Sequence, residues 1–412
     1  MKNVIKIFQP VISERTIKYV YEISGEWSEA FNLSENFFVE YSCNISNIPF
    51  GIAVIPFLCN ILPIVWVYDA DVYLEVCDKT FLESIPEFKK GYEDMYPMLE
   101  FKGNIHAENI EDNSQKDNKG AVSFFSGGVD AFNTLVNHID EKPTLLTVWG
   151  ADITFEDEEG WKNVYNHIRQ TASQFDVEVV TIKSAFRRFI NPDILNKKVE
   201  ASCDMWWHGF QHGIGIIAHA APVCYVKKKK TVYFASSFTA ADKGKITCAS
   251  DPTIDSFVKF AGSCVVHDGY EFSRQDKVHN IVEFSNKNGI KVPLRVCWKS
   301  TGGKNCCQCE KCWRTILELI AEGASAENYD LNYNYKQLKS FHKLFYDKKN
   351  IPEYRKSSVY SEIQKTMRKN LNYNNLPAEL KWFYKTDIRK LGYHPYRHFF
   401  GKCKSKAKKL IG

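Results

Sequence analysis

The chain has 412 residues, of which 44% are hydrophobic and 25% are charged, and its formal net charge is +5. This composition excludes a disordered chain or a small disulfide-stapled one, and the length allows two or three domains with sizeable cores. The first residues lack a signal-peptide pattern, so we expect a cytoplasmic protein. The apolar segment 48–68 contains three prolines and one asparagine, so we expect buried helix and strand there, not a membrane span.

Residues 1–110 predict an α+β domain without a recognisable chemical motif. We expect strands at 37–42, 71–75 and 99–110, and helices at 57–67 and 81–96. The segment 111–120 that follows is wholly polar and ends in glycine, which is typical of a linker.

From residue 121 the pattern alternates between strands and helices. We expect strands at 121–125, 144–149, 177–182, 231–235 and 263–266, and helices at 131–136, 158–175 and 205–225. This alternation predicts an α/β domain over 121–330, with a parallel sheet covered by helices on both faces. In such sheets the ligand lies at the carboxyl ends of the strands.

The segment Ser126-Gly127-Gly128-Val129-Asp130 lies between the first of these strands and a helix. Glycines let backbone N–H groups approach a phosphate, and a helix start adds unpaired donors and the positive end of its dipole. The Ser126 hydroxyl would add a further contact, and the Asp130 carboxylate would hold Mg²⁺ or a water beside the phosphates. The alternative is an ordinary glycine-rich turn.

Polar residues also follow other strands of this sheet. Trp149 and Gly150 close the second strand, and Ser236 and Ser237 follow the fourth, with Lys243 further along the same loop. We expect these residues to lie beside the nucleotide, although a polar loop without a binding role explains the last three equally well.

Two further pairs carry weaker signals. His208 and His212 are spaced i, i+4 and could hold a metal, but without a Glu-based motif we expect them to be packed or hydrogen-bonded. Arg274 and Lys277 could face a phosphate or an acidic substrate, although such a pair is more often a solvated face.

Four of the 13 cysteines have the spacing Cys-x8-Cys-x2-Cys-x2-Cys: Cys297, Cys306, Cys309 and Cys312. Without an export signal, crowded cysteines favour metal binding over disulfides. Four thiolates can wrap one tetrahedral Zn²⁺, and full coordination leaves no open position, so we expect a structural zinc. An iron–sulfur cluster is the rival interpretation. Cys307 is either a spare thiol or a competitor of Cys306.

At these two motifs the chain resembles the PP-loop ATP pyrophosphatases, whose signature after the first strand is Ser-Gly-Gly-x-Asp-Ser/Thr. Within them it is most similar to the cyano-deazaguanine synthases, whose zinc knuckle ends in Cys-x-x-Cys-x-x-Cys-x-Arg, here through Arg314. Ala131 replaces the final hydroxyl of the signature. The resemblance covers residues 121 to about 323, and not the N-terminal domain or the tail.

The resemblance implies a Rossmann-like sheet of the HUP/PP-loop type and an enzyme that uses ATP and Mg²⁺. Such an enzyme adenylates a carboxylate or carbonyl oxygen of its substrate and releases pyrophosphate, and AMP leaves when ammonia or another nucleophile attacks. Ser126 and Asp130 would be its catalytic residues. Diverged proteins similar to these synthases also occur in bacterial antiviral defence operons, which leaves that context open.

Two alternatives come from other functional classes. A nucleotide-sensing or scaffold protein is favoured by Ala131 and by the basic tail, and opposed by the retained Ser126 and Asp130. A tRNA- or DNA-modifying enzyme would use the tail: residues 331–412 carry 20 Lys and Arg against 5 Asp and Glu, whereas the rest carries 34 against 44. Such a tail could bind a nucleic acid or an acidic partner, but we favour a helical cap with a basic end at 402–409. Oligomer formation stays open.

Overall fold

The computed structural model describes residues 2–297, 303–346, 351 and 356–388. They fall into two compact units, one formed by Met1–Ser273 with Thr301–Gly303 and the other by Arg274–Ser300 with Lys304–Gly412. Residues 274–297 and 304–330 belong to the second unit, together with the C-terminal helices.

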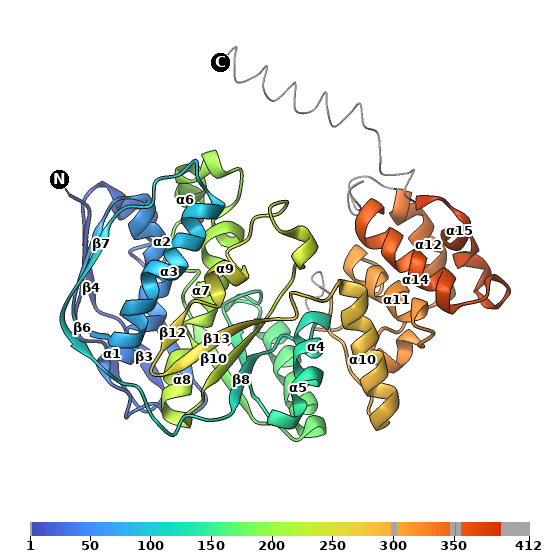
Figure 1. The fold of residues 1–412 in the computed structure, drawn as a ribbon, viewed down its shortest axis with the longest axis horizontal. Helices are drawn as coiled ribbons and strands as arrows, with labels where there is room; N and C mark the ends of the chain where they lie inside the picture. Colours follow the sequence, from blue (N-terminus) through green and yellow to red (C-terminus); the bar gives the residue numbers. More distant parts are fainter. Residues whose placement is uncertain (1, 298–302, 347–350, 352–355, 389–412) are drawn as a thin grey trace, which may run out of the picture. The chain divides into compact units, whose positions relative to one another are not determined.

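A nine-stranded sheet in the order β12-β13-β11-β8-β9-β10-β5-β3-β2 forms the centre of the first unit (Figure 1). Its five consecutive parallel strands are β13 (Ser263–Asp268), β11 (Thr231–Ala235), β8 (Ala121–Phe124), β9 (Thr144–Trp149) and β10 (Val179–Ser184). Antiparallel strands flank this parallel part on both sides: β12 (Lys259–Phe260) on one, and β5 (Phe38–Tyr41), β3 (Thr16–Lys18) and β2 (Val11–Ile12) on the other. The α/β class is therefore confirmed, but the sheet is mixed and not parallel throughout.

Helices cover both faces of the parallel strands, which explains why every residue of β8 is buried. The helices α4 (Val129–Asn137) and α5 (Glu158–Phe175) lie on one face, and α7 (His212–Ile217) and α8 (Ala220–Lys227) on the other (Figure 1). The single helix predicted over 205–225 is instead interrupted, because a π-helical turn at Trp207–Gln211 precedes α7. Gly213 must be glycine, since a Cβ there would lie 2.3 Å from the Ala249 carbonyl oxygen.

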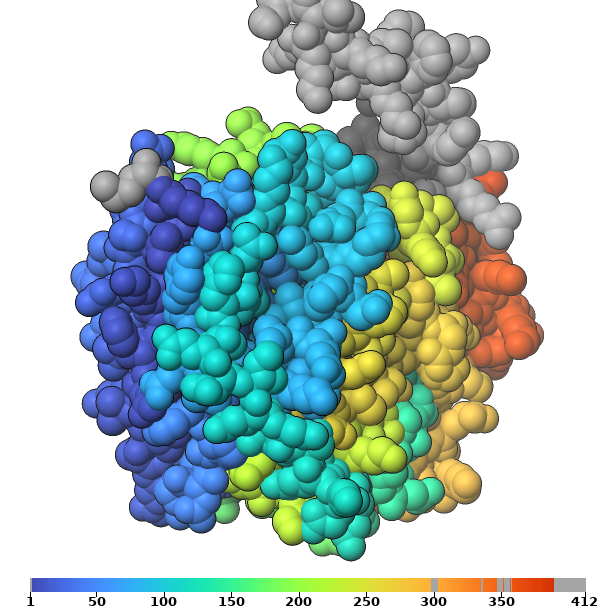
Figure 2. Space-filling view, turned by 60° about the vertical axis from the view of Figure 1, so that its left-hand side comes forward, coloured from blue at the N-terminus to red at the C-terminus, as the bar shows by residue number. Residues whose placement is uncertain are grey.

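The first 110 residues supply β2, β3 and β5 to the nine-stranded sheet and most of a second, four-stranded sheet that shares its core. This sheet has the order β4-β1-β6-β7, with β4 (Tyr21–Ser24), β1 (Val4–Ile7), β6 (Asp71–Asp78) and β7 (Asn104–Glu111). The helices α2 (Ile55–Val67) and α3 (Lys79–Met95) lie between the two sheets (Figure 1). In the space-filling view, the blue and cyan surface of this segment continues without a break into the yellow residues of the first unit (Figure 2).

The apolar segment 48–68 is a core element. All but one of the 13 residues of α2 are buried, which confirms the expected burial. Among them, the buried Asn60 side chain has hydrogen-bond partners, because its amide donates to the carbonyl oxygens of Pro56 at 2.8 Å and Gly215 at 3.1 Å. No helix within the described ranges combines the length and apolar character needed to cross a bilayer.

The second unit is helical, with α10 (Arg274–Asn288), α11 (Glu310–Ala321), α12 (Tyr335–Tyr346), α14 (Ser361–Asn370) and α15 (Lys381–Lys385). The aromatic residues Phe341, Phe345 and Phe383 are fully buried, and the rings of Trp313 and Phe341 stack at 5.1 Å. These aromatic side chains therefore form part of the core of the second unit. The basic run 402–409 lies outside the described residues.

Candidate nucleotide and metal sites

The strand order places two of the predicted loops together. From β8 the chain proceeds to β9 and β10 on one side and then returns to β11 and β13 on the other, so the order reverses between β8 and β11. In open α/β sheets, ligands bind in the crevice outside the carboxyl ends of the strands at such a reversal. Ser126 follows β8 and Ser236 follows β11, so both loops begin at this point.

The Ser126–Asp130 loop has the conformation that its glycines allow. Gly127 has a φ of +78°, in the left-handed region that disfavours side chains. Gly128 is extended and stands at the N-cap of α4, where it offers no side chain to cap the helix. Ser126 is exposed and Asp130 is half-buried in the first turn, whereas the Val129 side chain packs in the core. Backbone donors, a hydroxyl and a carboxylate thus share one helix start.

A polar network that the sequence did not predict fixes α4 against the end of β13. The Thr134 hydroxyl donates to one oxygen of Asp268 at 2.6 Å, and Nε2 of His138 lies 2.8 Å from the other. The hydrogen bond to Asp268 is the main cause that raises the pKa of His138. The imidazole also stacks on Tyr233 of β11 at 3.9 Å. The available signal was the i, i+4 spacing of Thr134 and His138, but their partner lies 130 residues away from His138.

Trp149 and Gly150 have clear structural roles at the end of β9. The Trp149 ring stacks on Trp161 at 5.2 Å, and Nζ of Lys183 lies 4.4 Å from its centroid. Gly150 has a φ of +107°, and a Cβ there would lie 2.2 Å from the Ser184 carbonyl oxygen. Glycine is therefore required where the ends of β9 and β10 approach, and nucleotide contact by this pair stays a prediction.

The loop after β11 presents only some of its predicted side chains. Ser236 is buried, and its hydroxyl donates to the Phe238 carbonyl oxygen at 2.6 Å. Ser237 and Lys243 are exposed. A ligand at the reversal point would therefore reach the side chains of Ser237 and Lys243 more readily than that of Ser236.

The four predicted cysteines converge in the second unit. The sulfur atoms of Cys297, Cys306, Cys309 and Cys312 all lie within 4.8 Å of one another, with Cys297 and Cys309 at 3.9 Å and Cys306 and Cys312 at 4.0 Å. Tetrahedral Zn–S bonds of about 2.3 Å place sulfurs about 3.8 Å apart, whereas a disulfide needs about 2.05 Å. The group can therefore hold a single metal ion such as zinc.

Helix α11 and one asparagine position these thiols. Cys309 is the N-cap of α11 and Cys312 lies in its first turn, where the helix dipole favours thiolates. The Asn305 side chain accepts hydrogen bonds from the N–H groups of Val296 at 2.9 Å and Cys297 at 3.2 Å, and donates to the Leu294 carbonyl oxygen at 2.7 Å. Asn305 thereby holds the Cys297 segment against the knuckle, a role that the sequence did not indicate.

Cys307 lies outside the four-sulfur group. Its sulfur is 3.8 Å from the Asn305 carbonyl oxygen, and its backbone is left-handed at a φ of +49°. Burial raises the pKa of Cys307 to about 12, so this thiol stays protonated near neutral pH. The structure thus favours the spare-thiol interpretation.

The structure also shows the surroundings of the two residue pairs with weaker sequence signals, His208 with His212 and Arg274 with Lys277. Among the described residues, only the four cysteines bring three or more metal-binding side chains together, and His208 instead bonds to Asp204 at 2.9 Å. The expectation of packed or hydrogen-bonded histidines is therefore confirmed. The solvated face expected for Arg274 and Lys277 is wrong, because Arg274 contacts Glu318 at 3.4 Å and Lys277 is buried.

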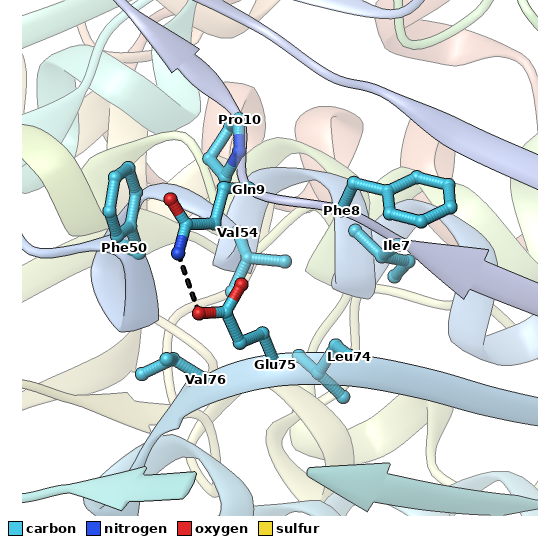
Figure 3. Close-up of a pocket in the computed structure, with 9 residues that line it drawn as sticks. All are labelled: Ile7, Phe8, Gln9, Pro10, Phe50, Val54, Leu74, Glu75 and Val76. Atoms are coloured by element: carbon cyan, nitrogen blue, oxygen red, sulfur yellow. Dashed lines mark hydrogen bonds between the residues drawn. The ribbon is translucent and has the colours of Figure 1, made fainter. Parts of the chain in front are cut away.

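A small pocket in the first unit contains none of the predicted site residues (Figure 3). Its lining comes from β1, from α1 (Phe50–Ala53) and its flanks, and from β6, and it is mostly apolar. The amide of Gln9 donates to a Glu75 oxygen at 2.6 Å across it (Figure 3). We assign no binding role to this pocket.

Comparison of the chain with known protein families, characterised proteins and solved structures gives no match. The PP-loop resemblance, which rests on residues 126–130 and on the four cysteines, therefore stays a prediction.

Proposed function

We propose that the chain is an ATP-dependent enzyme of the PP-loop kind, which adenylates a carboxylate or carbonyl oxygen of a small-molecule substrate and releases pyrophosphate. One observation carries this proposal. The Ser126–Asp130 loop, with its left-handed Gly127 and the start of α4, stands at the point where the strand order of the sheet reverses.

The reaction follows from what this loop can bind. Backbone N–H groups of the loop and the Ser126 hydroxyl would hold the β- and γ-phosphates. The substrate oxygen attacks the α-phosphorus, and the bond from that phosphorus to pyrophosphate breaks. Asp130 would hold Mg²⁺, which would supply charge neutralisation for the leaving pyrophosphate. Ammonia or another nucleophile then attacks the activated carbon, and AMP departs.

The four cysteines belong to the second unit and have a structural role in this proposal. Four thiolates complete a tetrahedral coordination shell and leave no open position, so a zinc ion there would stabilise the fold. A second candidate, nucleotide binding without turnover, is favoured by one observation: Ala131, where the signature has a hydroxyl, is 5% exposed and packs in the core.

Replacing Gly127 with alanine tests whether the loop binds the nucleotide. A Cβ in the left-handed region costs about 1–2 kcal/mol, so the peptide will reorient and its N–H will leave the phosphate. We expect the Kd for MgATP to rise at least about tenfold in isothermal titration calorimetry.

Gly289→Ala is the matched control, because Gly289 has a φ of +64° with open space around its Cβ position. It should carry a similar backbone strain and leave the Kd unchanged. An unaltered Kd in Gly127→Ala would refute nucleotide binding by this loop.

A further inference from the structure

Strand β7 (Asn104–Glu111) is an edge of the four-stranded sheet in the first unit. It pairs with β6 on one side, and the order of the sheet ends with it. The strand is eight residues long, against an average of about 5–6, and its register with β6 contains no bulge. An edge of this length presents a row of backbone groups with which another strand can pair.

One hydrogen bond shows which backbone groups of β7 face outward. The Asn104 N–H donates at 3.2 Å to the carbonyl oxygen of Ala70, the residue just before β6. Because the backbone groups of successive residues alternate between the two sides of a strand, those of Ile105, Ala107 and Asn109 point away from β6. Within the described part of the chain, the N–H and C=O groups of these three residues have no hydrogen-bond partner.

The strand also lacks features that keep natural sheet edges from pairing. Residues 104–111 include neither lysine nor proline, which commonly block an exposed edge. All eight are exposed or half-buried. Ile110 is 57% exposed, and Tyr73 on the neighbouring β6 is 43% exposed. The strand therefore offers unpaired backbone groups together with apolar side chains.

The charges of β7 favour a second copy of this chain as the partner. If two copies pair antiparallel about Ala107, His106 of each copy lies opposite Glu108 of the other. Because the outward backbone groups belong to Ala107 and its alternate neighbours, His106 and Glu108 would form non-hydrogen-bonded pairs, in which Cα atoms are only about 4.5 Å apart. Moving the axis by one residue would oppose two copies of Glu108 or two of His106, which is unfavourable for like charges.

We propose that the chain forms a symmetric dimer in which the β7 strands of two copies pair antiparallel about Ala107. Ala107 would pair with its counterpart, and Ile105 of each copy with Asn109 of the other, which gives about six backbone hydrogen bonds. The two four-stranded sheets would thereby become one continuous sheet. The contact uses one strand from each copy, so we expect weak association, with a Kd of about 1–100 µM.

This dimer goes beyond the proposed function and does not depend on it, because β7 contains no residue of the phosphate loop or of the cysteine group. The test is sedimentation velocity of the full chain without nucleotide, at protein concentrations from about 1 to 300 µM. The buffer is kept at pH 6, where imidazole groups are largely protonated. We expect the sedimentation coefficient to rise with concentration as the dimer forms.

A charge exchange tests the register. Glu108→Lys would place a positive charge opposite His106 of the other copy, and we expect the Kd of the dimer to rise at least about tenfold. Adding His106→Glu restores opposite charges with their signs exchanged, and should return the Kd to within about threefold of the wild-type value. Glu87→Lys is the matched control, because Glu87 is an exposed carboxylate on α3, and it should leave the Kd unchanged.

Ala107→Pro tests the backbone pairing. The Ala107 N–H points away from β6, so proline there keeps the bonds to β6 and removes the central donors of the dimer. We expect this variant to stay monomeric.

A wild-type chain that stays monomeric over the whole concentration range would overturn the proposal. A dimer with an unchanged Kd in Glu108→Lys would also overturn it, since that dimer would use another surface. Weakening by Glu108→Lys without recovery in the double variant would overturn the register. Because Glu108 is exposed, these comparisons stand even if Ala107→Pro fails to fold.

Discussion

Asp130→Ala should reduce ATP-dependent pyrophosphate release by at least about a hundredfold, because the charge on the departing pyrophosphate would lose its carboxylate-held counterion. Asp130 is half-buried in the first turn of α4, where loss of its favourable interaction with the helix dipole should cost about 0.3–1 kcal/mol. We therefore expect the unfolding midpoint to fall by a few degrees at most. A coupled pyrophosphate assay and differential scanning fluorimetry measure the two quantities.

Asp140→Ala is the matched control for this substitution. Asp140 is an exposed carboxylate just beyond the end of α4. Asp140→Ala therefore removes the same charge from the same segment as Asp130→Ala. It should leave turnover unchanged. Equal activity in the two variants would show that Asp130 has no special role.

Removing the metal should unfold much of the second unit, because the four thiolates join α11 to the Cys297 segment. Apparent binding free energies of structural zinc sites are about 10–16 kcal/mol, which exceeds the stability of most domains. We expect about one zinc per chain by elemental analysis. A strong chelator should remove an entire unfolding transition in calorimetry.

Two cysteine variants separate metal loss from a general loss of packing. Cys309→Ser should lose the metal and that transition, whereas Cys307→Ser should keep both, since Cys307 lies outside the group. A brown protein with iron and sulfide would contradict the zinc assignment. Full stability after complete chelation would contradict the structural role.

The elements that the sequence predicted well are those with strong local signals. The strand expected at 144–149 has those bounds, and so does the helix at 158–175, whose apolar residues recur at helical spacing. The strands β1 to β4 were missed because they are two to four residues long and depend on pairing with distant segments. The helix at 205–225 was predicted without its interruption, because a π-helical turn leaves no simple pattern.

The site residues that the sequence predicted are likewise those that belong to local motifs. The Ser126 loop and the four cysteines are local motifs, and the structure brings the four cysteines together. Asp268 and Asn305 were missed as site residues, because each acts through partners that only the fold brings near. Asp268, for example, lies 134 residues away from Thr134.

The identity of the nucleotide product tests the central claim most directly. The wild-type chain is incubated with α-labelled ATP, Mg²⁺ and fractionated cell extract as the source of carboxylate substrates, and the products are separated by chromatography. We predict that at least one fraction yields labelled AMP with an equal amount of pyrophosphate, and that Asp130→Ala yields neither. Labelled ADP with inorganic phosphate, or no AMP from any fraction despite tight ATP binding, would contradict the proposed adenylation.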